Sequence, residues 1–451
     1  MTGHRRDGSA RTGRAGLCTD LYELRMVESY LRRGMTGPAT FSLFVRPAAA
    51  RPWYVAFGVQ RLVELLESFR YGDEELAYLR SQGIGEETLD WLGALEPTGQ
   101  VWAVPDGTVV LAQEPIAEVS APLPVAQLLE TAALNLVQYS TAVATKAARC
   151  ALAAEGRRLA DFGFRRAHGI ETGVEAALAA FVGGGFATSN VEAGRRHGIP
   201  VTGTMAHSYI QAFNDERDAF GAFAGDHPDH TVLLVDTYDT LEGVRRAIAV
   251  AEEELAPRGH RLQGIRLDSG DLGDLAQQSR KLLDDAGLHD TEIFASGSLD
   301  EYRIHELVGE QAPIDAFGVG SALTTSSDHP ALDIVYKLVD YDGRSVAKFS
   351  GAKSTWPGRK QVFRPADGPD GDVLSLRDAD EAGRRLLEPV WRDGAVLLPF
   401  DAAATRERVT TGLAALPAAW RLPPYPGEAP LPRIGAALVA EAGRVREAAF
   451  G

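Results

Sequence analysis

The stretch VTGTMAHS, residues 201–208, joins an apolar run to a polar turn that contains a histidine. The residues that follow, SYIQAFNDERDAFGAF, have the apolar spacing of a helix. The pattern predicts a strand that ends near His207 and a helix that begins directly after it. In α/β enzymes the catalytic side chains lie at the carboxyl ends of strands. His207 is therefore a candidate catalytic residue, although the spacing alone leaves an ordinary hydrogen-bonded histidine open.

The same rhythm of strand and helix repeats on both sides of this stretch. Apolar runs that end in Gly, Asp or Ser alternate with helical segments, as expected for repeated βα units and a parallel sheet. Because no GxGxxG or Walker sequence accompanies them, we expect an irregular parallel βα barrel rather than a doubly wound sheet. The runs are RLADFGF (158–164), PVTGTMA (200–206), TVLLVDTYD (231–239), LQGIRLDSGD (262–271), TEIFASGS (291–298) and IDAFGVGS (314–321).

The rest of the chain predicts a second lobe. Helical and strand-like segments precede the barrel, and strands and Pro-rich segments follow it. We expect a disordered tail over 1–16, a mixed α/β lobe built from 17–124 with 340–451, and the barrel over 125–339. Within the long helix expected after Val125, the polar residues Asn135, Gln138 and Lys146 are expected to form its solvated face.

Composition limits the classes of partner. The chain has 451 residues with 62 acidic and 46 basic side chains, and this negative charge disfavours nucleic acid and anionic membranes as partners. Its two cysteines predict neither a disulfide framework nor a zinc site. No apolar core of a signal peptide follows the basic first residues, and no apolar run is long enough to span a membrane. We therefore expect a cytoplasmic protein.

The residues at the predicted strand ends would share one face of a barrel. Two late runs end in Gly and Ser before a helix, which suits a phosphate cradle of backbone N–H groups, although tight turns have the same composition. Arginines and aspartates gather at the other ends, where they could bind phosphate, ribose hydroxyls or Mg²⁺, or form structural ion pairs. These residues are Asp161, Arg165, Arg166, Asp236, Asp239, Arg266, Asp268 and Asp271.

Several motifs together resemble the nicotinate phosphoribosyltransferase family, a type II phosphoribosyltransferase family. The most specific pair is GTMAHS (203–208) with IRLDSGDL (265–272). In the same order along the chain lie TDLYEL (19–24), DFGFRRAHG (161–169), GGFATSN (184–190), DTYDT (236–240), FASGSLDE (294–301), FGVGS (317–321) and the segment from 335 to 364.

The resemblance implies an enzyme of NAD salvage, of the Preiss–Handler type. Such an enzyme transfers the ribosyl group of phosphoribosyl pyrophosphate to nicotinate, and it forms nicotinate mononucleotide and pyrophosphate. Family likeness implies coupling to ATP hydrolysis, with ATP and Mg²⁺ as cofactors and a phosphohistidine at His207, and thus a ligase that performs glycosyl transfer. An imidazole can accept a phosphoryl group near neutral pH and later lose it to water.

The resemblance also implies roles for individual residues. Arg266 would bind the anionic groups of the substrates, and Asp268 would take ribose hydroxyls or Mg²⁺, so both join His207 as catalytic residues. Phe162 and Tyr22 would stack on the pyridine ring, with Tyr22 supplied by the partner subunit of a homodimer with shared active sites. Spacing alone indicates only an exposed tyrosine at that position. The remaining substrate-binding residues are Arg165, Thr188, Ser189, Asp236, Ser269, Ser296, Gly297, Gly320 and Ser321, and no metal ligand is assigned with certainty.

The choice between acid and amide substrates depends on the GGFATSN segment. Nicotinamide-using relatives place an acidic residue near this position, whereas Thr188, Ser189 and Asn190 carry no carboxylate that would repel nicotinate. The alternatives are a nicotinamide- or quinolinate-using phosphoribosyltransferase, a barrel lyase or isomerase for phosphosugars with His207 as acid and base, and an inactive nucleotide sensor. One departure is Gly297-Ser298, where many relatives have Gly-Asp or Asn-Asp, and it leaves the roles in this loop open.

Overall fold

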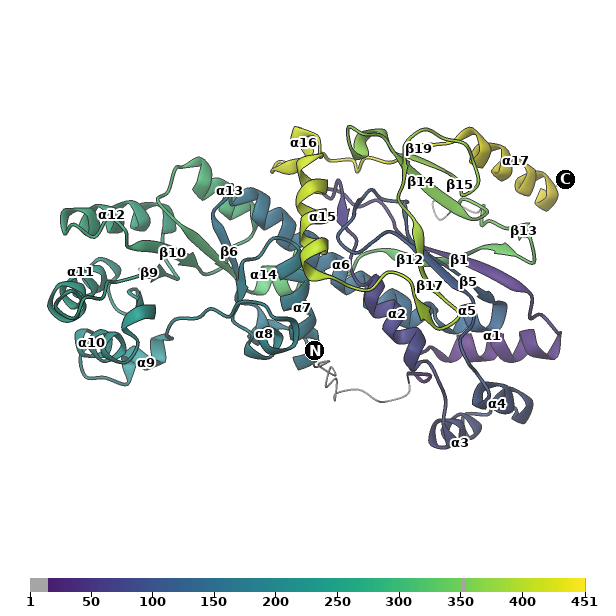
Figure 1. Cartoon of the computed structure of the whole chain (residues 1–451), viewed down its shortest axis with the longest axis horizontal. Coiled ribbons are helices and arrows are strands. Elements are labelled where there is room, and N and C mark those ends of the chain that lie inside the picture. Colours follow the sequence, from purple (N-terminus) through teal and green to yellow (C-terminus); the bar gives the residue numbers. More distant parts are fainter. Residues whose placement is uncertain (1–14, 350–353, 451) are drawn as a thin grey trace, which may run out of the picture. The chain divides into compact units, whose positions relative to one another are not determined.

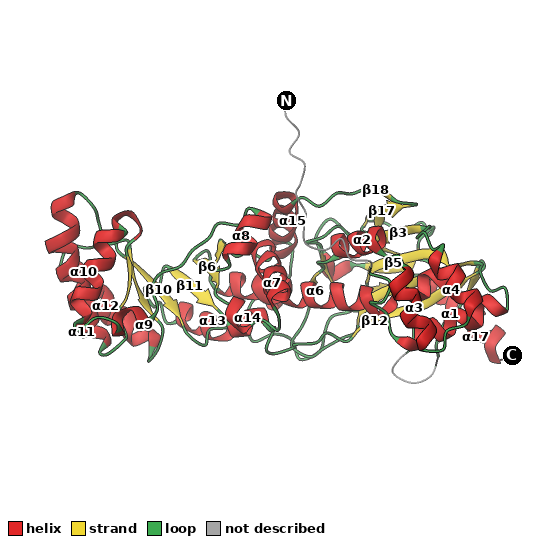
Figure 2. Cartoon of the chain, turned by 90° about the horizontal axis from the view of Figure 1, so that it is seen from below, coloured by secondary structure: helices red, strands yellow, loops and turns green. Residues whose placement is uncertain are grey.

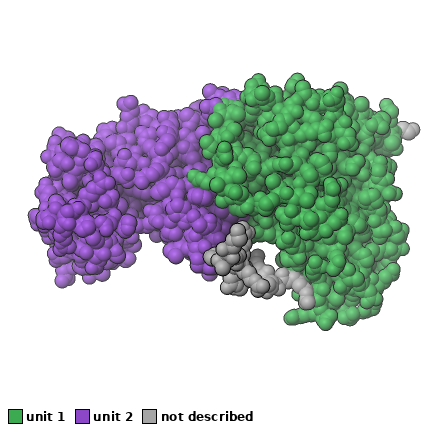
Figure 3. Space-filling view, viewed as in Figure 1, with its two compact units in different colours: residues 1–141, 332–416, 426–451 green, residues 142–331, 417–425 purple. Residues whose placement is uncertain are grey.

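The computed structural model describes residues 15–349 and 354–450, and the expected tail over 1–16 therefore lies almost wholly outside the described residues. The chain divides into two compact units (Figure 3). Unit 1 comprises residues 1–141, 332–416 and 426–451, and unit 2 comprises residues 142–331 and 417–425. The first division falls inside helix α6 (Glu130–Ala153). No helix of the described chain is both long and apolar enough to cross a membrane.

Unit 2 contains the parallel sheet that the sequence predicts. Within the described residues this sheet has six strands in the order β7-β6-β11-β10-β9-β8, of which β6, β9 and β10 are labelled in Figure 1. The first strand of this sheet along the chain, β6, pairs in parallel with the last one, β11. This pairing is typical of a closed βα barrel and not of a doubly wound sheet. The prediction of an irregular parallel βα barrel is confirmed, and the sheet has the form of a half-barrel. The strands are β6 (Arg158–Asp161), β7 (Ala187–Thr188), β8 (Val232–Leu234), β9 (Gly264–Leu267), β10 (Glu292–Ser296) and β11 (Ala316–Val319).

One predicted strand is wrong. The run 200–206 forms no strand, and its only ladder contact is a parallel bridge between Val201 and Thr188. Pro200 has no N–H to donate, and the exposed Gly203 has neither a side chain to pack nor a ladder partner. The strand next to this run is β7, a two-residue strand that the sequence pattern did not predict.

The parallel register decides which side chains face the site. Arg266 lies level with Phe294, and Ser296 lies level with Gly318. Side chains alternate between the two faces of a strand, so the residues two positions further along point the same way. Phe162, Arg266, Asp268, Phe294 and Ser296 therefore share one face. The opposite face carries large apolar side chains.

Helices follow the strands of unit 2 and cover this apolar face. Helices α7, α11 and α12 contact the sheet, and Figure 2 draws them in red with strands β6, β10 and β11 in yellow. The helices of this unit are α7 (Ile170–Val182), α8 (Val191–His197), α9 (His207–Gln211), α10 (Glu216–Asp226), α11 (Thr240–Val250), α12 (Leu272–Asp285), α13 (Glu301–Gly309), α14 (Ser321–Thr324) and α16 (Ala418–Arg421).

Unit 1 is the mixed α/β lobe. Its largest sheet has the order β13-β12-β1-β5-β3-β17-β18 and is antiparallel, and a smaller sheet has the order β16-β14-β15-β19. Its strands are β1 (Pro38–Val45), β2 (Tyr54–Val55), β3 (Gln100–Ala103), β4 (Val109–Val110), β5 (Pro115–Pro122), β12 (Ile334–Tyr341), β13 (Arg344–Ser345), β14 (Lys360–Arg364), β15 (Val373–Leu376), β16 (Arg384–Arg385), β17 (Glu388–Arg392), β18 (Ala395–Val396) and β19 (Arg433–Ile434). Its helices are α1 (Leu21–Arg32), α2 (Val59–Ser68), α3 (Asp73–Ser81), α4 (Glu86–Gly93), α5 (Leu123–Leu128), α15 (Ala402–Ala414) and α17 (Ala436–Phe450).

The expected solvated face of the helix after Val125 is wrong at Lys146. This side chain is 0% exposed, and its ammonium lies 2.5 Å from a Glu301 carboxylate oxygen and 2.8 Å from one of Asp328. Arg149, one turn further along α6, pairs with the same two carboxylates. A buried charge is tolerated when it is paired in this way. The cluster joins α6, the start of α13 and the loop at Asp328 within unit 2.

Unit 1 contains a buried carboxyl pair that predicts a pH-dependent stability. Glu114 and Asp372 are buried beside a single arginine, Arg364, whose Nη2 lies 2.6 Å from Asp372 but 3.8 Å from Glu114. Burial, and then repulsion from Asp372, raises the pKa of Glu114 well above its usual value. A raised pKa in the folded state contributes stability that is complete below the unfolded value, about 4.3, and that is lost as the pH rises through the folded pKa.

Glu114→Gln is therefore expected to stabilise the protein increasingly as the pH rises. Glutamine keeps the acceptor for the Leu111 N–H and carries no charge that must be desolvated. The gap in melting temperature between variant and wild type should widen by a few degrees from pH 5 to pH 8, as thermal unfolding would measure. Glu96→Gln, at an exposed carboxylate of the same unit, is the control and should show no such trend. A gap that does not change with pH would contradict the prediction.

Candidate active site

His207 lies where the sequence analysis expected it, at the start of a helix. It is the first residue of α9, and its side chain is 40% exposed. Its Nδ1 lies 3.1 Å from the Thr237 hydroxyl, which follows β8. Its Nε2 lies 3.9 Å from an Asp268 carboxylate oxygen. The ring is thus oriented by partners on both sides while remaining open to solvent, as a nucleophile or proton carrier requires.

Arg266 and Asp268 continue the site from strand β9. Their side chains approach within 3.9 Å, and Arg266 also donates from Nη1 to the Thr204 hydroxyl at 2.7 Å. Burial lowers the pKa of Arg266, whereas Asp268 and then Asp236 act in the opposite direction. A largely desolvated guanidinium binds an anion more strongly than an exposed one does.

Asp236 connects the ends of β8 and β9. Its Oδ2 accepts the backbone N–H of Asp268 at 3.0 Å and the hydroxyl of Ser269 at 2.7 Å. Its Oδ1 is buried and has no hydrogen-bond partner among the described residues. Because a buried carboxylate oxygen is normally paired, this atom offers a position for a substrate hydroxyl or a cation.

An aromatic platform lies beside Arg266. The rings of Phe162 and Phe294 are stacked, with centroids 5.5 Å apart and planes at 16°, and the Arg266 guanidinium lies 6.0 Å from the Phe162 ring. Gly318 leaves room for this stack, because a Cβ there would come within 2.9 Å of both rings. Phe294 and Gly318 were not among the predicted site residues. Their alternation with Ser296 and Gly320 along the same strands was the signal that could have found them.

The loop after β10 is held against β9. The Ser296 hydroxyl donates to Asp268 at 2.5 Å, and the next residue, Gly297, has a φ of +91°. A Cβ at Gly297 would lie 1.9 Å from the carbonyl oxygen of Asp268, so only glycine fits. Ser298, where the sequence departs from the family pattern, also has a positive φ, a conformation in which Asp and Asn are enriched.

Gly297→Ala is expected to displace this loop or the backbone at Asp268, because the clash is with main-chain atoms. We expect a loss of about 1–3 kcal/mol in stability and a matching fall in kcat/KM. Thermal unfolding and steady-state kinetics measure both. The control is Gly309→Ala at the end of α13, where a Cβ meets nothing within 4 Å. Equal behaviour of the two variants would contradict the steric argument.

The remaining predicted residues of unit 2 occupy the loops around this centre. Gly320 caps the short helix α14, which begins at the exposed Ser321. Arg165 lies in the turn after β6 and is exposed, and its charge lowers the pKa of Arg266, so the two cations lie near each other. Ser189 follows β7 and is half-buried. These positions agree with a shared rim formed by the carboxyl ends of the strands.

Two predicted residues lie outside this cluster. The Thr188 hydroxyl donates to the buried Asp161 at 2.7 Å, on the sheet face opposite Phe162. Tyr22 belongs to α1 in unit 1 and is 47% exposed. Burial, and then the charge of Glu130, raises the pKa of Tyr22, so its hydroxyl stays protonated at neutral pH. The site assignment of Thr188 and Tyr22 stays a prediction.

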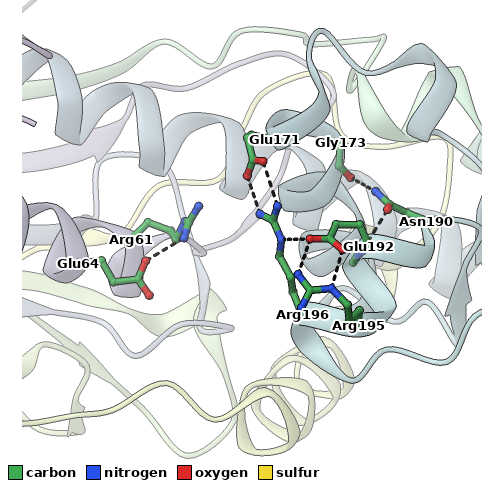
Figure 4. Close-up of polar contacts among 9 residues, drawn as sticks. Arg61, Glu64, Glu171, Gly173, Asn190, Glu192, Arg195 and Arg196 are labelled. Atoms are coloured by element: carbon green, nitrogen blue, oxygen red, sulfur yellow. Dashed lines mark hydrogen bonds and ion pairs between the residues drawn. The ribbon is translucent and has the colours of Figure 1, made fainter. Parts of the chain in front are cut away.

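The helices next to β7 are fixed by their own polar contacts (Figure 4). Arg196 on α8 lies 2.6 Å from Glu171 on α7 and 2.7 Å from Glu192 on its own helix. The Asn190 side chain caps α8 by accepting the N–H of Ala193, and it donates to the carbonyl of Gly173 on α7. Together these contacts hold the loop that carries Ser189.

The described residues contain no group of three or more His, Cys, Asp or Glu side chains that could hold a metal ion. Asp236 and Asp268 nevertheless come from adjacent strands, and Asp236 Oδ1 is unpaired. Mg²⁺ is commonly held by one or two carboxylates together with substrate phosphates and water. The donor set therefore fits a Mg²⁺ ion that arrives with a phosphorylated substrate.

Comparison with known proteins identifies the family. Two family models match the chain, the nicotinate phosphoribosyltransferase N-terminal domain over residues 17–138 and the nicotinate phosphoribosyltransferase family over residues 157–365. The chain is 46% identical to nicotinate phosphoribosyltransferase pncB2 of Mycobacterium tuberculosis, with 84% of this chain and 82% of the relative covered. It is 44% identical to nicotinate phosphoribosyltransferase of Bacillus subtilis, with 83% and 79% covered.

A solved structure has a fold similar to that of this chain. The crystal structure of human nicotinic acid phosphoribosyltransferase matches with a TM-score of 0.82 at 29% identity, and the match covers 95% of this chain and 99% of that one. This chain thus shares its fold with that solved structure. This chain belongs to the nicotinate phosphoribosyltransferase family.

Proposed function

We propose that this protein transfers the ribosyl group of phosphoribosyl pyrophosphate to nicotinate, in the salvage of NAD. The pyridine nitrogen attacks the anomeric carbon, the bond from that carbon to the pyrophosphate oxygen breaks, and nicotinate mononucleotide and pyrophosphate are formed. The observation that carries the proposal is the meeting of His207, Arg266 and Asp268 with an aromatic platform at one end of the barrel sheet. The relatives named above supply the choice of nicotinate.

The aromatic platform and Arg266 suit the pyridine substrate. A planar ring can stack on Phe162, and the adjacent guanidinium can bind the carboxylate by two parallel hydrogen bonds. Tyr22 of the partner subunit would cover the other face of the ring. The Thr188–Asn190 segment carries no carboxylate, which favours the acid over the amide.

The acidic side chains and the glycine turns suit the ribosyl substrate. Asp268 and the unpaired oxygen of Asp236 can accept ribose hydroxyls or hold Mg²⁺, which would neutralise charge on the departing pyrophosphate. Gly297 lies in the loop before α13, Gly320 caps α14 and Ser321 begins it, and backbone N–H groups at these positions can bind the 5′-phosphate. Displacement at an oxocarbenium-like carbon needs positioning and charge neutralisation more than a strong nucleophile.

We further propose that ATP drives the reaction through a phosphohistidine. The γ-phosphoryl group of ATP is transferred to His207 with release of ADP, and water later cleaves the P–N bond to give phosphate. The ring is accessible and is oriented by Thr237, and Arg266 lies on the same rim to balance the added negative charge.

We also propose a cytoplasmic homodimer. Tyr22 is exposed in unit 1, outside the barrel unit, and we propose that the pyridine site receives this residue from a second copy of the chain. Both cysteines are free thiols, as expected in a reducing compartment. Sedimentation decides the oligomeric state, and a fully active monomer would refute the shared site.

The test is a turnover assay with nicotinate and phosphoribosyl pyrophosphate, with and without ATP. Parallel assays replace nicotinate by nicotinamide or quinolinate. Nicotinate mononucleotide should form fastest from nicotinate, and ATP should increase the rate and be hydrolysed in the process. Preference for another base would refute nicotinate as the substrate. Absence of pyrophosphate release with all three bases would refute the proposed transfer reaction. A rate that does not depend on ATP would refute the proposed coupling.

A further inference from the structure

Asp161 and Thr188 form a buried pair beneath the site. They are the last residues of β6 and β7, and the parallel register places them side by side. Asp161 is 2% exposed and Thr188 is 1% exposed. The Thr188 hydroxyl donates to Asp161 Oδ2 at 2.7 Å, and the backbone N–H of Gly163 donates to Oδ1 at 2.8 Å. Both oxygens of this carboxylate are therefore used inside the protein.

Asp161 has a demanding environment for a carboxylate. Burial raises its pKa, and only the hydrogen bonds from Thr188 and Gly163 act in the opposite direction, with no cation among its partners. A desolvated carboxylate is costly unless its acceptor positions are filled by donors. Here one donor belongs to the last residue of β7 and the other to the loop after β6, both at the carboxyl end of the sheet. The free-energy cost of burying the Asp161 carboxylate is therefore incurred directly beside the loops that follow β6 and β7.

The pair controls the loop that follows β6. Phe162 and Gly163 directly follow Asp161, and the hydrogen bond to the Gly163 N–H fixes the turn that leads to Arg165. Gly163 is also packed tightly, since a Cβ there would lie 2.6 Å from Thr324 and 3.1 Å from the carbonyl oxygen of Gly320. The turn thus connects the aromatic platform with the glycine loop after β11.

The pair also controls the loop that follows β7. The carbonyl oxygen of Asp161 accepts the N–H of Ser189, and the Thr188 hydroxyl accepts the N–H of Asn190 at 3.1 Å. The Thr188 hydroxyl therefore donates to the Asp161 carboxylate at the end of β6 and accepts from Asn190 in the loop after β7. The backbone of Thr188 bonds to Pro200 and Thr202, which lead into the segment that carries His207.

We propose that Asp161 and Thr188 are positioning residues for the pyridine site, a role that rests on the proposed function. Both side chains point to the sheet face opposite Phe162, so they act through other residues and do not touch the substrate. Asp161 holds Phe162 and Arg165 in place, and Thr188 ties this turn to the loop of Ser189. The pair therefore sets the width and shape of the slot that receives the base.

The proposal is tested with Thr188→Val, Thr188→Ser and Asp161→Asn. Valine keeps the shape of threonine but removes the hydroxyl, and serine keeps the hydroxyl. Asparagine replaces one acceptor oxygen of Asp161 by an NH₂ group, which donates and cannot accept. The control is Thr291→Val, because Thr291 is equally buried, donates to the Leu262 carbonyl at 3.1 Å and lies at the opposite, amino end of strand β10. Thr188→Val and Thr291→Val remove the same group from the same sheet.

Two measurements are made on each variant. The KM for nicotinate should rise on the order of tenfold to a hundredfold in Thr188→Val and Asp161→Asn, with a smaller change in the KM for phosphoribosyl pyrophosphate. Thr188→Ser should restore the wild-type value, and Thr291→Val should keep it. Hydrogen exchange at residues 162–166 and 189–193 should accelerate in Thr188→Val and Asp161→Asn and stay unchanged in Thr291→Val.

The outcomes separate this proposal from the proposed function. If wild type does not use nicotinate, the proposed function fails, and the exchange data still decide whether the pair orders the two loops. If wild type is active but Thr188→Val and Thr291→Val have the same KM values and the same exchange, the positioning role is refuted. If loop exchange accelerates while the KM for nicotinate stays constant, the pair has a structural role only, and the proposal is likewise refuted.

Discussion

His207→Ala is expected to lose all stimulation by ATP while the protein keeps its fold. The side chain is 40% exposed and contributes little buried surface, so its removal should change the melting temperature only slightly. The imidazole is the proposed acceptor of the γ-phosphoryl group, and no other histidine lies within 4 Å of Asp268 among the described residues. Turnover should fall to the rate that wild type shows without ATP, a loss on the order of a hundredfold or more.

The measurement combines kinetics with a chemical test of the intermediate. Wild type incubated with γ-labelled ATP should carry acid-labile label, and His207→Ala should carry none. His260→Ala is the matched control, because His260 also approaches a carboxylate, that of Asp229 at 3.0 Å, yet lies before β9 at the other end of the strand. Full stimulation by ATP in His207→Ala would rule out the phosphohistidine.

Asp268→Asn is expected to reduce kcat/KM for phosphoribosyl pyrophosphate by about a hundredfold to a thousandfold. Asp268 is the common partner of Ser296, Arg266 and His207, and asparagine has nearly its shape but no charge. The variant loses the carboxylate charge that we propose to hold ribose hydroxyls or Mg²⁺, and the charge of the Arg266 guanidinium is no longer balanced by Asp268. Both changes act on the charge that develops as pyrophosphate departs.

The control for this variant is Asp215→Asn. Asp215 caps α10 by accepting the N–H of Arg217, and asparagine caps a helix equally well. Its kinetics should equal those of wild type. If Asp268→Asn changes only the KM for nicotinate and leaves the ribosyl substrate unaffected, then Asp268 serves the pyridine site and the assignment of the two substrates must be exchanged.

Much of the barrel could be predicted from local patterns. The segments that form β6, β8, β9, β10 and β11 are continuous apolar runs followed by Gly, Asp or Ser. This pattern is typical of buried parallel strands and the loops that follow them. His207 was placed at the start of a helix because the apolar period changes there. Residues at strand ends meet at one edge of a parallel sheet, so Arg266 and Asp268 could be grouped before any coordinates, whereas the strand expected before His207 does not form.

Other features depend on contacts between segments that are distant in sequence. The pattern around residues 200–206 predicts a strand, yet this run makes only one bridge, from Val201 to Thr188 of β7, and β7 itself pairs with β6 over only two residues. Lys146 has the periodicity of a solvated position, yet Glu301 and Asp328, more than 150 residues further on, bury and neutralise it. The stack of Phe162 on Phe294 likewise depends on the register between strands.

The sequence by itself determined the alternation of strands and helices, the family motifs and the residues at the strand ends, because period and turn chemistry are local properties. The tertiary structure alone decided which side chains touch, as in the hydrogen bond from Thr188 to Asp161 and the approach of His207 to Asp268. Such contacts follow from strand order and register, which many distant residues fix together.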